Sequence, residues 1–489
     1  MNKENGKKKT GKIVWLVIKS ALVILQLVVS ALLVVSLVNM GIIDNWIITV
    51  IGLVLLAILI LNVVILLVRQ KSKMWAQVIC IILGIICIAG SIFALNYTDA
   101  FNGFLDKITG KKPELKTYNV LVINDEINDI QELDNKSFSL LSNDKDAKRA
   151  EEYLNELISF NVTYYDDLGI MLDVLKNGLT DAIVLESGRT DVLIGEDNEE
   201  SIAVDGLKIV YTFEIEIEKK EAETSNKNIT LEPFIIYISG SDSRTGIKGL
   251  GLSDVNIVVV VNQRSGKILL ASIPRDTYVQ LHGTEGLKDK LTHAGIYGID
   301  MSKTTIEDFL GIKIDYTVKV SFDTVIKVVD TLGGIDIYSD TKMNLNKNCH
   351  YIEGWQHVDG TCALRFARER KSYYLGDKHR GYNQQEVLTA IINKMTSSKE
   401  YLLKAPEILN VASETFETSL SRDDIIGFIR MQLANPIKWE IESVSVDGEG
   451  TKEPTYSMGA SLPLYVMIAD EDSVNSVVNK INEYLTVSE

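Results

Sequence analysis

Three long apolar runs near the start of the chain constrain its fold more than any other feature of the sequence. They cover residues 13–38, 47–68 and 75–95. Each is long enough for a helix to cross a bilayer core, which takes roughly 20 residues. A cleaved signal peptide would show one short apolar stretch and a small-residue cleavage site, whereas here three runs follow one another. The pattern predicts a permanent anchor of three transmembrane helices in residues 1–95.

The charges that flank these runs predict their orientation. Five lysines precede the first run and three basic residues lie between the second and the third, whereas the segment 39–46 carries only Asp44. Positively charged flanks stay in the cytoplasm. We therefore expect a multi-pass protein of the cell membrane with a cytoplasmic N-terminus and with residues 96–489 outside the cell.

The net charge excludes one class of partner. The whole chain has a formal charge of −16, and residues 1–95 contain nine Lys or Arg and two Asp or Glu, so residues 96–489 carry −23. Nucleic acid is excluded as a partner of this part, because binding it requires phosphate charges to be neutralised. Any other anionic ligand must meet a local basic cluster.

The cysteines leave one question open. Cys80 and Cys87 lie in the third apolar run, whereas Cys349 and Cys362 lie in the part expected outside, 13 residues apart. A disulfide is chemically permitted there, and two buried thiols are the alternative. No Cys or His spacing indicates a zinc site.

The part beyond the apolar runs divides into two α/β regions. Residues 96–117 are polar and predict a stalk, and the charged residues 220–230 predict a linker. Between them, apolar spacing at 146–158 and 166–179 predicts two helices within a small α/β domain at 118–219. That domain shows no nucleophile, glycine loop or metal pattern.

From residue 231 to residue 489 the pattern predicts an α/β sandwich. Apolar, β-branched runs such as "PFIIYISG", "VNIVVVVN" and "KILLAS" are typical of buried central strands. The segments 321–334 and 386–395 have the spacing of helices. Helices interleaved with buried strands favour a layered α/β domain.

Polar residues stand where the apolar strands end. Asp242 and Arg244 follow one strand, and Asp254 precedes the next. If the two strands pair, the two carboxylates approach each other and suit Mg²⁺, which binds one or two carboxylates together with phosphate oxygens and water. The alternative is that both aspartates are turn or cap residues. Arg275 lies at the end of a further strand.

One segment, "LRFARERKSYYLGDKHRGYNQQ" (364–385), holds six basic and two acidic residues. In an extended stretch Arg368 and Arg370 would share one face, and their fork geometry suits phosphate oxygens. Arg380 and Gln384 follow at the start of a predicted helix, spaced so that both can reach one ligand. A solvated basic surface is the alternative.

Six segments together resemble the LytR-CpsA-Psr family of cell-wall ligases. In the family's order they are "ISGSDSR", "LSDVNIV", "SIPRDTYV", "DKLTHAGIYG", "VSFDTVIKVVDTLGGIDI" and "DGTCALRFARERKSYYLGDKHRGYNQQEV". Three spans and a small domain ahead of them look most like the CpsA-type members. The resemblance implies that 118–219 is an accessory α/β domain and that 231–489 is an α/β/α-type catalytic domain with a mixed central sheet.

The resemblance also implies a function. Such enzymes are extracellular phosphotransferases that move a glycopolymer, capsular or teichoic-acid-like, from a polyprenyl pyrophosphate carrier to peptidoglycan, leaving a phosphodiester. Asp242 and Asp254 would hold Mg²⁺, or Mn²⁺ in its place, and Asp242 and Arg275 would be catalytic. The positions that match pyrophosphate-binding residues of the family are Arg244, Lys290, Arg368, Arg370, Arg380 and Gln384, with Asp377 orienting the arginines.

The sequence departs from the family pattern at one position and leaves other functions open. Many members carry an arginine directly before the matched glutamine, where this chain has Asn383. An asparagine donates a hydrogen bond but brings no charge. A non-catalytic regulator or scaffold of envelope polymer synthesis, and a lipid pyrophosphatase that uses water as acceptor, are the two alternatives.

Overall fold

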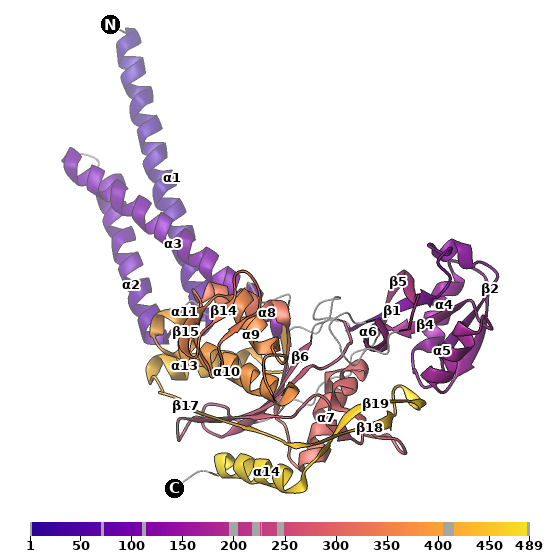
Figure 1. The fold of residues 1–489 in the computed structure, drawn as a ribbon. Coiled ribbons are helices and arrows are strands. Elements are labelled where there is room, and N and C mark those ends of the chain that lie inside the picture. The colour runs from indigo at the N-terminus through magenta and orange to yellow at the C-terminus, as the bar shows by residue number, and fades with distance from the viewer. Residues whose placement is uncertain are drawn as a thin grey trace. The chain divides into compact units, whose positions relative to one another are not determined.

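The computed structural model separates the chain into two compact units (Figure 1). One contains Met1–Lys107 and Ile425–Asn435, and the other contains Ile108–Asp424 and Pro436–Glu489. The residues that the structure describes are 2–69, 73–109, 114–194, 204–217, 225, 227–241, 249–374, 376–403 and 415–486.

The first unit contains three helices that are long and apolar enough to cross a membrane, as the sequence predicts. They are α1 (Asn2–Met40), α2 (Asn45–Asn62), which a π-helical turn continues over Val63–Val68, and α3 (Met74–Thr109). Many of their Ile, Leu and Val side chains are exposed, as a lipid-facing surface requires. Residues 425–435, which include most of α13 (Arg422–Ala434), belong to the same unit.

Polar side chains connect the three helices. Asn62 Nδ2 donates to Gln26 Oε1 at 2.8 Å and so connects α2 to α1. Ser36 Oγ and Thr98 Oγ1 lie 2.5 Å apart and connect α1 to α3. Hydrogen bonds of this kind help to determine which helix faces pack together in a membrane. The apolar helices therefore form a defined bundle.

The stretch expected to be a stalk, residues 96–117, is largely regular structure. Helix α3 continues to Thr109, and the first strand of the second unit begins at Glu114. The polar composition of this stretch marks the end of the apolar surface but not the end of the helix.

The second unit begins with a five-stranded mixed sheet in the order β3-β2-β4-β1-β5. Its strands are β1 (Glu114–Val122), β2 (Lys136–Leu141), β3 (Phe160–Tyr165), β4 (Ala182–Glu186) and β5 (Lys208–Ile217). The helices are α4 (Ala147–Asn155), α5 (Leu168–Lys176), α6 (Ser187–Ile194) and the 3-10 turn η2 (Ile130–Leu133). We call residues 114–217 the accessory domain; its helices α4 and α5 lie where the sequence predicts them.

The accessory domain has a core on each face of its sheet. One core packs Ala150 and Leu154 of α4 against strand residues such as Val120 and Phe138. The other packs α5 and α6 against the opposite face and also contains Met458, from a distant part of the chain. The second face is therefore covered partly by residues outside the accessory domain.

A six-stranded mixed sheet forms the centre of the rest of the second unit, in the order β16-β11-β6-β7-β8-β17. The β11–β6 and β17–β8 pairs are parallel and the other pairs are antiparallel. The strands are β6 (Phe234–Ser241), β7 (Val255–Asn262), β8 (Lys267–Ser272), β11 (Tyr316–Ser321), β16 (Phe416–Thr418) and β17 (Glu440–Ser445). The mixed sheet that the family resemblance implies is confirmed.

Helices cover both faces of this sheet, and Figure 1 shows α9 and α10 on one side and α14 on the other. The helices are α7 (Ile299–Leu310), α8 (Phe322–Thr331), α9 (Gly360–Arg368), α10 (Asp377–Thr396), α11 (Lys399–Leu403) and α14 (Glu471–Leu485). Ile306 of α7 and Ile481 of α14 are fully buried in one core with Val258 and Leu269 of the sheet. Helices α8, α9 and α10 form a separate core around Phe366.

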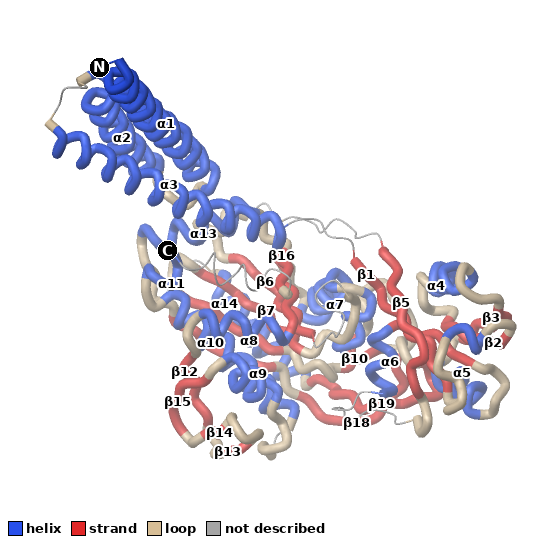
Figure 2. Tube along the Cα trace, turned by 90° about the horizontal axis from the view of Figure 1, so that it is seen from above, coloured by secondary structure: helices blue, strands red, loops and turns tan. Residues whose placement is uncertain are grey.

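Short elements complete the second unit, which Figure 2 shows from above. Two small hairpins pair β12 (Ile335–Ser339) with β15 (Gly354–Val358) and β13 (Met343–Asn344) with β14 (His350–Tyr351). A long hairpin pairs β18 (Gly448–Thr455) with β19 (Gly459–Ala469). The pair β9 (Tyr278–Val279) and β10 (Asp289–Lys290) leads into the 3-10 segment η3 (Leu291–Tyr297).

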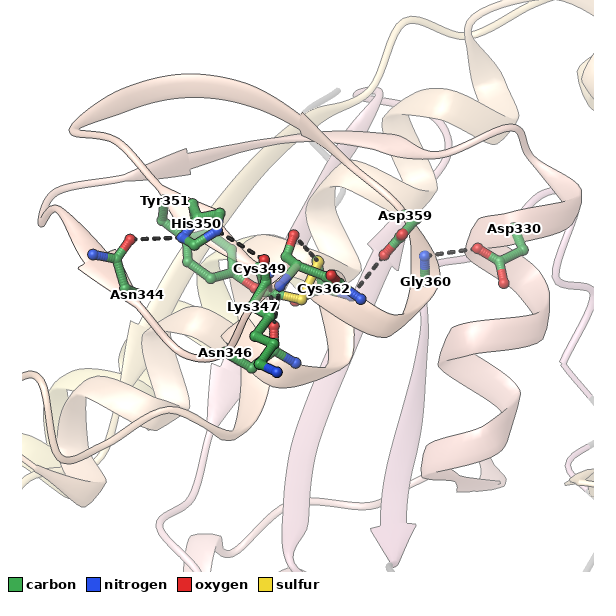
Figure 3. Close-up of a disulfide and its surroundings, with 11 residues drawn as sticks. Asp330, Asn344, Asn346, Lys347, Cys349, His350, Tyr351, Asp359, Gly360 and Cys362 are labelled. Carbon is green, nitrogen blue, oxygen red and sulfur yellow. Dashed lines mark hydrogen bonds between the residues drawn. A yellow bond between two sulfur atoms is a disulfide. The ribbon is translucent and has the colours of Figure 1, made fainter.

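Cys349 and Cys362 form a disulfide, which decides the alternative that the sequence left open (Figure 3). The bond joins the hairpin β13–β14 to α9. Asp359 caps the start of α9 by accepting from the backbone N–H of Cys362 at 2.8 Å, and Tyr351 Oη donates to the Cys362 carbonyl at 2.6 Å. The disulfide therefore holds the start of the helix that ends at Arg368.

Candidate active site

Arg275 is the buried centre of the site. It follows β8 in the sequence "SIPRD", where the N–H of Thr277 donates to the carbonyl of Pro274 and closes a turn. Its guanidinium is 7% exposed; Nη1 lies 2.9 Å from Asp254 Oδ1, and Nε lies 3.7 Å from Asp276 Oδ2. The turn thus places one arginine between two carboxylates, Asp254 from the start of β7 and Asp276 from the turn itself.

Arg380 is the second buried arginine of the site. It lies in the first turn of α10, where Nη2 is 2.9 Å from Asp377 Oδ1. Asp377 Oδ1 in turn lies 3.9 Å from Arg275 Nε, so one carboxylate stands between the two arginines. Burial and the positive charge of Arg275 lower the pKa of Arg380 from its ordinary value. A bound anion would relieve that repulsion.

The two arginines line a common cavity, which we call the arginine cavity. Its polar lining consists of Asp254, Asn256, Ser272, Arg275, Asp377, Lys378, Arg380, Gln384 and Ser445. These residues come from the ends of β7, β8 and β17 and from the start of α10. The structure therefore brings together five residues that the sequence nominated: Asp254, Arg275, Asp377, Arg380 and Gln384.

Asp254 is the described residue that fits a metal. The strands β6 and β7 pair antiparallel, as the sequence argument required, and the N–H of Asp254 donates to the carbonyl of Gly240 at 2.8 Å. Arg275 contacts Oδ1 of Asp254, and no hydrogen bond or ion pair to a described residue involves Oδ2. A carboxylate oxygen that no described residue contacts suits Mg²⁺ when phosphate oxygens and water complete the coordination shell of the ion. Asp242 and Arg244 lie outside the described residues.

Lys290 lies on the other side of Arg275. Its Nζ is 2.5 Å from Asp276 Oδ1, and both side chains are about 95% buried. Burial alone would raise the pKa of Asp276, but the charges of Lys290 and Arg275 hold it below the ordinary value. A second cavity, which we call the Lys290 cavity, is lined by Val192, Leu252, Arg275, Lys290, Thr292, His293 and Leu464. Arg275 lines both cavities.

The expectation that Arg368 and Arg370 share a face of an extended stretch is wrong. Asp359 caps a helix at Gly360, and α9 continues to Arg368, so only the residues after it are extended. The Arg368 guanidinium lies over the ring of Phe322, 4.9 Å from its centroid. Neither arginine is among the described residues that line the arginine cavity or the Lys290 cavity.

Asn383 faces the protein interior. Its side chain is 3% exposed, and Nδ2 donates to the carbonyl of Phe366 at 3.0 Å. This hydrogen bond fastens α10 to α9. The position at which many family members carry an arginine therefore holds two helices together in this chain.

The sequence patterns did not indicate several residues that line the site. Ser272 and Ser445 end the parallel strands β8 and β17 and line the arginine cavity. Asn256 also lines it and accepts from Tyr237 Oη at 2.6 Å. A serine at the end of an apolar run does not by itself indicate a site. These two serines become site residues because β8 and β17 are neighbours in the sheet and end at the same cavity.

The sequence is similar to proteins of one known family. The sequence model of the LytR_cpsA_psr family matches residues 208–482. A polyisoprenyl-teichoic acid–peptidoglycan teichoic acid transferase TagU of Bacillus mycoides is 30% identical over 258 residues, which are 53% of this chain and 80% of that protein. The protein of the same name from Halalkalibacterium halodurans is 31% identical over 259 residues, which are 53% of this chain and 81% of that protein.

Solved structures with a similar chain include two from B. subtilis. TagV is 29% identical and is aligned over 53% of this chain and 99% of its own, with a TM-score of 0.44. TagT is 28% identical and is aligned over 55% of this chain and 100% of its own, with a TM-score of 0.43.

Proposed function

This chain belongs to the LytR-CpsA-Psr family, and on that premise we propose that it is a membrane-anchored phosphotransferase that attaches a glycopolymer to peptidoglycan. The donor is a glycan linked to a polyprenyl pyrophosphate, and the product is a phosphodiester between glycan and peptidoglycan. The relatives from Bacillus mycoides and Halalkalibacterium halodurans are named teichoic acid transferases, which supports this reaction class. The polymer is capsular or teichoic-acid-like.

The observation that carries the proposal is the pair of buried arginines in one cavity. Arg275 and Arg380 compete for the same carboxylate, Asp377, and the charge of Arg275 lowers the pKa of Arg380. Two guanidiniums that repel each other away from bulk water are stabilised by an anion with several oxygens. A pyrophosphate supplies such an anion, and Gln384 adds a donor on the same wall.

The reaction needs positioning and charge stabilisation more than covalent chemistry. The acceptor hydroxyl oxygen, from the muramic acid of peptidoglycan, attacks the phosphorus that carries the glycan. Its proton passes to a base, the bond from that phosphorus to the bridging oxygen breaks, and polyprenyl monophosphate leaves. Arg275 and Arg380 bind the phosphate oxygens and stabilise the charge that builds on the leaving oxygen.

Asp254 and Asp242 would together hold Mg²⁺ or Mn²⁺. When bound, such an ion would offset the negative charge of the phosphates and orient the phosphate oxygens in the site. Asp242 is also the candidate base for the acceptor hydroxyl. Arg244, Lys290, Arg368 and Arg370 complete the proposed set of pyrophosphate ligands, with Lys290 acting from the far side of Arg275.

The site faces the outside of the cell in this proposal, and the carrier lipid lies in an apolar groove between sheet and helices. The lysine-rich N-terminus supports a cytoplasmic start. The Cys349–Cys362 disulfide supports an oxidising location for the second unit. A reporter fused to the C-terminus tests the orientation, which a cytoplasmic reporter signal would contradict.

Purified full-length protein, a polyprenyl pyrophosphate-linked glycan, Mg²⁺ and peptidoglycan fragments test the activity. The expected products are glycan-bearing peptidoglycan and polyprenyl monophosphate, both detected by mass spectrometry. Arg275→Ala should abolish them, whereas Arg264→Ala, which removes an arginine whose Nε bonds the Leu231 carbonyl at 2.6 Å, should not. Release of the lipid phosphate without glycan attachment would identify a pyrophosphatase. Binding without any turnover would identify a regulator.

A further inference from the structure

The accessory domain and the catalytic sheet share one buried interface within the second unit. Leu168 and Met171 of α5 and Leu193 of α6 are at most 1% exposed and pack in one core with Ile296 and Met458. The helix α6 and the segment η3 pack so closely that a Cβ at Gly188 would lie only 2.7 Å from Ile296 Cγ1. A core of this kind fixes the two parts together, since packed interiors tolerate little displacement.

Arg189 lies in the centre of this interface and is fully buried. It pairs with Glu186 of its own domain. Its Nε donates to the carbonyl of Ser457 at 2.8 Å, and its Nη2 donates to Tyr297 Oη at 3.1 Å. Ser457 lies in the turn between β18 and β19, and Tyr297 ends η3. An accessory-domain arginine thus holds two segments of the catalytic part.

Ser457 passes this constraint to Asp289. The N–H of Ser457 donates to Asp289 Oδ2 at 2.9 Å. Ser457 Oγ and Asp289 Oδ1 lie 2.9 and 2.6 Å from His293 Nδ1. Asp289 is completely buried. Because a buried carboxylate depends on its hydrogen-bond donors, and the N–H of Ser457 is one of them, a shift of Ser457 would displace Asp289.

Asp289 is the neighbour of Lys290 on β10, and the N–H of Lys290 donates to Asp289 Oδ1 at 2.8 Å. The Lys290 ammonium reaches Asp276, which lies beside Arg275. The backbone continues the connection, because Thr292 N–H donates to the Arg275 carbonyl at 2.8 Å. A continuous series of buried polar contacts therefore runs from Arg189 to both cavities.

We propose that Arg189 is a positioning residue for the pyrophosphate site, and that the accessory domain is in this way a structural part of the catalytic centre. Arg189 holds Ser457, Ser457 holds Asp289, and Asp289 holds β10 so that Lys290 and Arg275 stay in place. Val192, also on α6, closes the wall of the Lys290 cavity. The inference rests on the proposed function, because the ligand of the positioned residues is the lipid pyrophosphate.

The test compares two changes at the same interface in the full chain, purified in detergent. Arg189→Lys keeps the positive charge near Glu186 but loses the fork that reaches Ser457 and Tyr297. Ser461→Ala is the matched control: it removes the hydrogen bond that Ser461 Oγ donates to Asp167 Oδ1 across the same interface. Among the described residues, Ser461 makes no hydrogen bond to Ser457, Asp289 or Lys290. Farnesyl diphosphate with Mg²⁺ is the probe, and binding is measured by calorimetry.

Displacement of one charged phosphate contact costs about tenfold in affinity. We therefore expect Arg189→Lys to bind the probe about tenfold more weakly than the wild type, and Ser461→Ala to bind within about twofold. In the transfer reaction Arg189→Lys should raise KM for the lipid donor and leave KM for the peptidoglycan acceptor unchanged. A purely structural residue would change both constants or neither.

A milder variant keeps the inference testable if Arg189→Lys does not fold. Tyr297→Phe removes a single acceptor of Arg189 and should weaken probe binding about threefold. Wild-type affinity for the probe in Arg189→Lys would overturn this inference but not the proposed function. If Arg189→Lys does not fold, wild-type affinity in Tyr297→Phe would do the same. An equal loss in Ser461→Ala would do the same. A wild-type protein that does not bind the probe would overturn the proposed function and this inference with it.

Discussion

Replacement of Arg380 by methionine separates the binding role of this residue from its role in stability. Arg380 is 11% exposed and pairs with Asp377, and burial and Arg275 both disfavour its charge. Methionine has a similar length and no charge. Asp377 would keep Arg275 Nε at 3.9 Å, so no carboxylate is left without a positive neighbour. We therefore expect the ligand-free Arg380→Met protein to unfold within about 1 kcal/mol of the wild type.

The same substitution should have a large effect on ligand binding. A hydrogen bond to a charged group contributes about 1.5–3 kcal/mol, so two lost contacts to phosphate weaken binding about 100-fold. At a prenyl diphosphate concentration 100 times the wild-type Kd, the ligand stabilises the wild type by about 2.7 kcal/mol. For a protein with a 100-fold higher Kd, the stabilisation falls to about 0.4 kcal/mol.

Urea denaturation with and without farnesyl diphosphate measures both quantities on one sample. Arg264→Met is the control, because Arg264 bonds the Leu231 carbonyl and lines neither cavity. It should show the full ligand stabilisation. The reasoning fails if Arg380→Met is stabilised by the ligand as strongly as the wild type. It also fails if the ligand-free variant loses more than about 2 kcal/mol, since Arg380 would then be a structural residue.

Three further outcomes follow from other parts of the second unit. Replacing both Cys349 and Cys362 by serine should lower the free energy of unfolding by about 3 kcal/mol, as expected for a loop of this length, and dithiothreitol should do the same to the wild type but not to the variant. Asp276→Asn should cost about 3–5 kcal/mol at pH 7, because Lys290 loses its buried partner. Burial opposes the ionisation of Asp276, but Lys290 and Arg275 hold its pKa below the unfolded value of about 3.9. Its contribution is therefore complete above about pH 5 and is lost as the pH falls through the lower folded pKa, so denaturation curves of the two proteins should converge in acid. Gly188→Ala should cost about 1–3 kcal/mol in thermal unfolding, because its Cβ would meet Ile296; an unchanged midpoint would show that the interface yields.

Local patterns in the sequence were sufficient for the elements with strong apolar periodicity or long apolar runs. Apolar spacing located α4 and α5, and β-branched runs located β6, β7 and β8, because burial of one face or of both faces is a local property of the chain. The prediction of an extended stretch in the basic segment was wrong, and the reason is also local. Asp359 caps α9, so the residues up to Arg368 are helical and Arg368 and Arg370 do not share one face of an extended stretch.

The site depended on information that no local pattern contains. Asp254, Arg275 and Arg380 meet because β7, β8 and α10 come together, and it was the order of motifs in a known family that nominated them. Sequence patterns gave no reason to single out Arg189. Its bond to the Ser457 carbonyl joins residues 268 positions apart, and a buried arginine has no signature until its partners are known.

The most direct measurement is a single-turnover transfer reaction with a glycan carrying ³²P in the phosphate next to the sugar. The account predicts that the label moves to peptidoglycan in the presence of Mg²⁺ with wild-type protein, that unlabelled polyprenyl monophosphate appears in equal amount, and that Arg275→Ala transfers none. Label released as free sugar phosphate, or label that remains on the lipid while the protein binds it, would contradict the central claim.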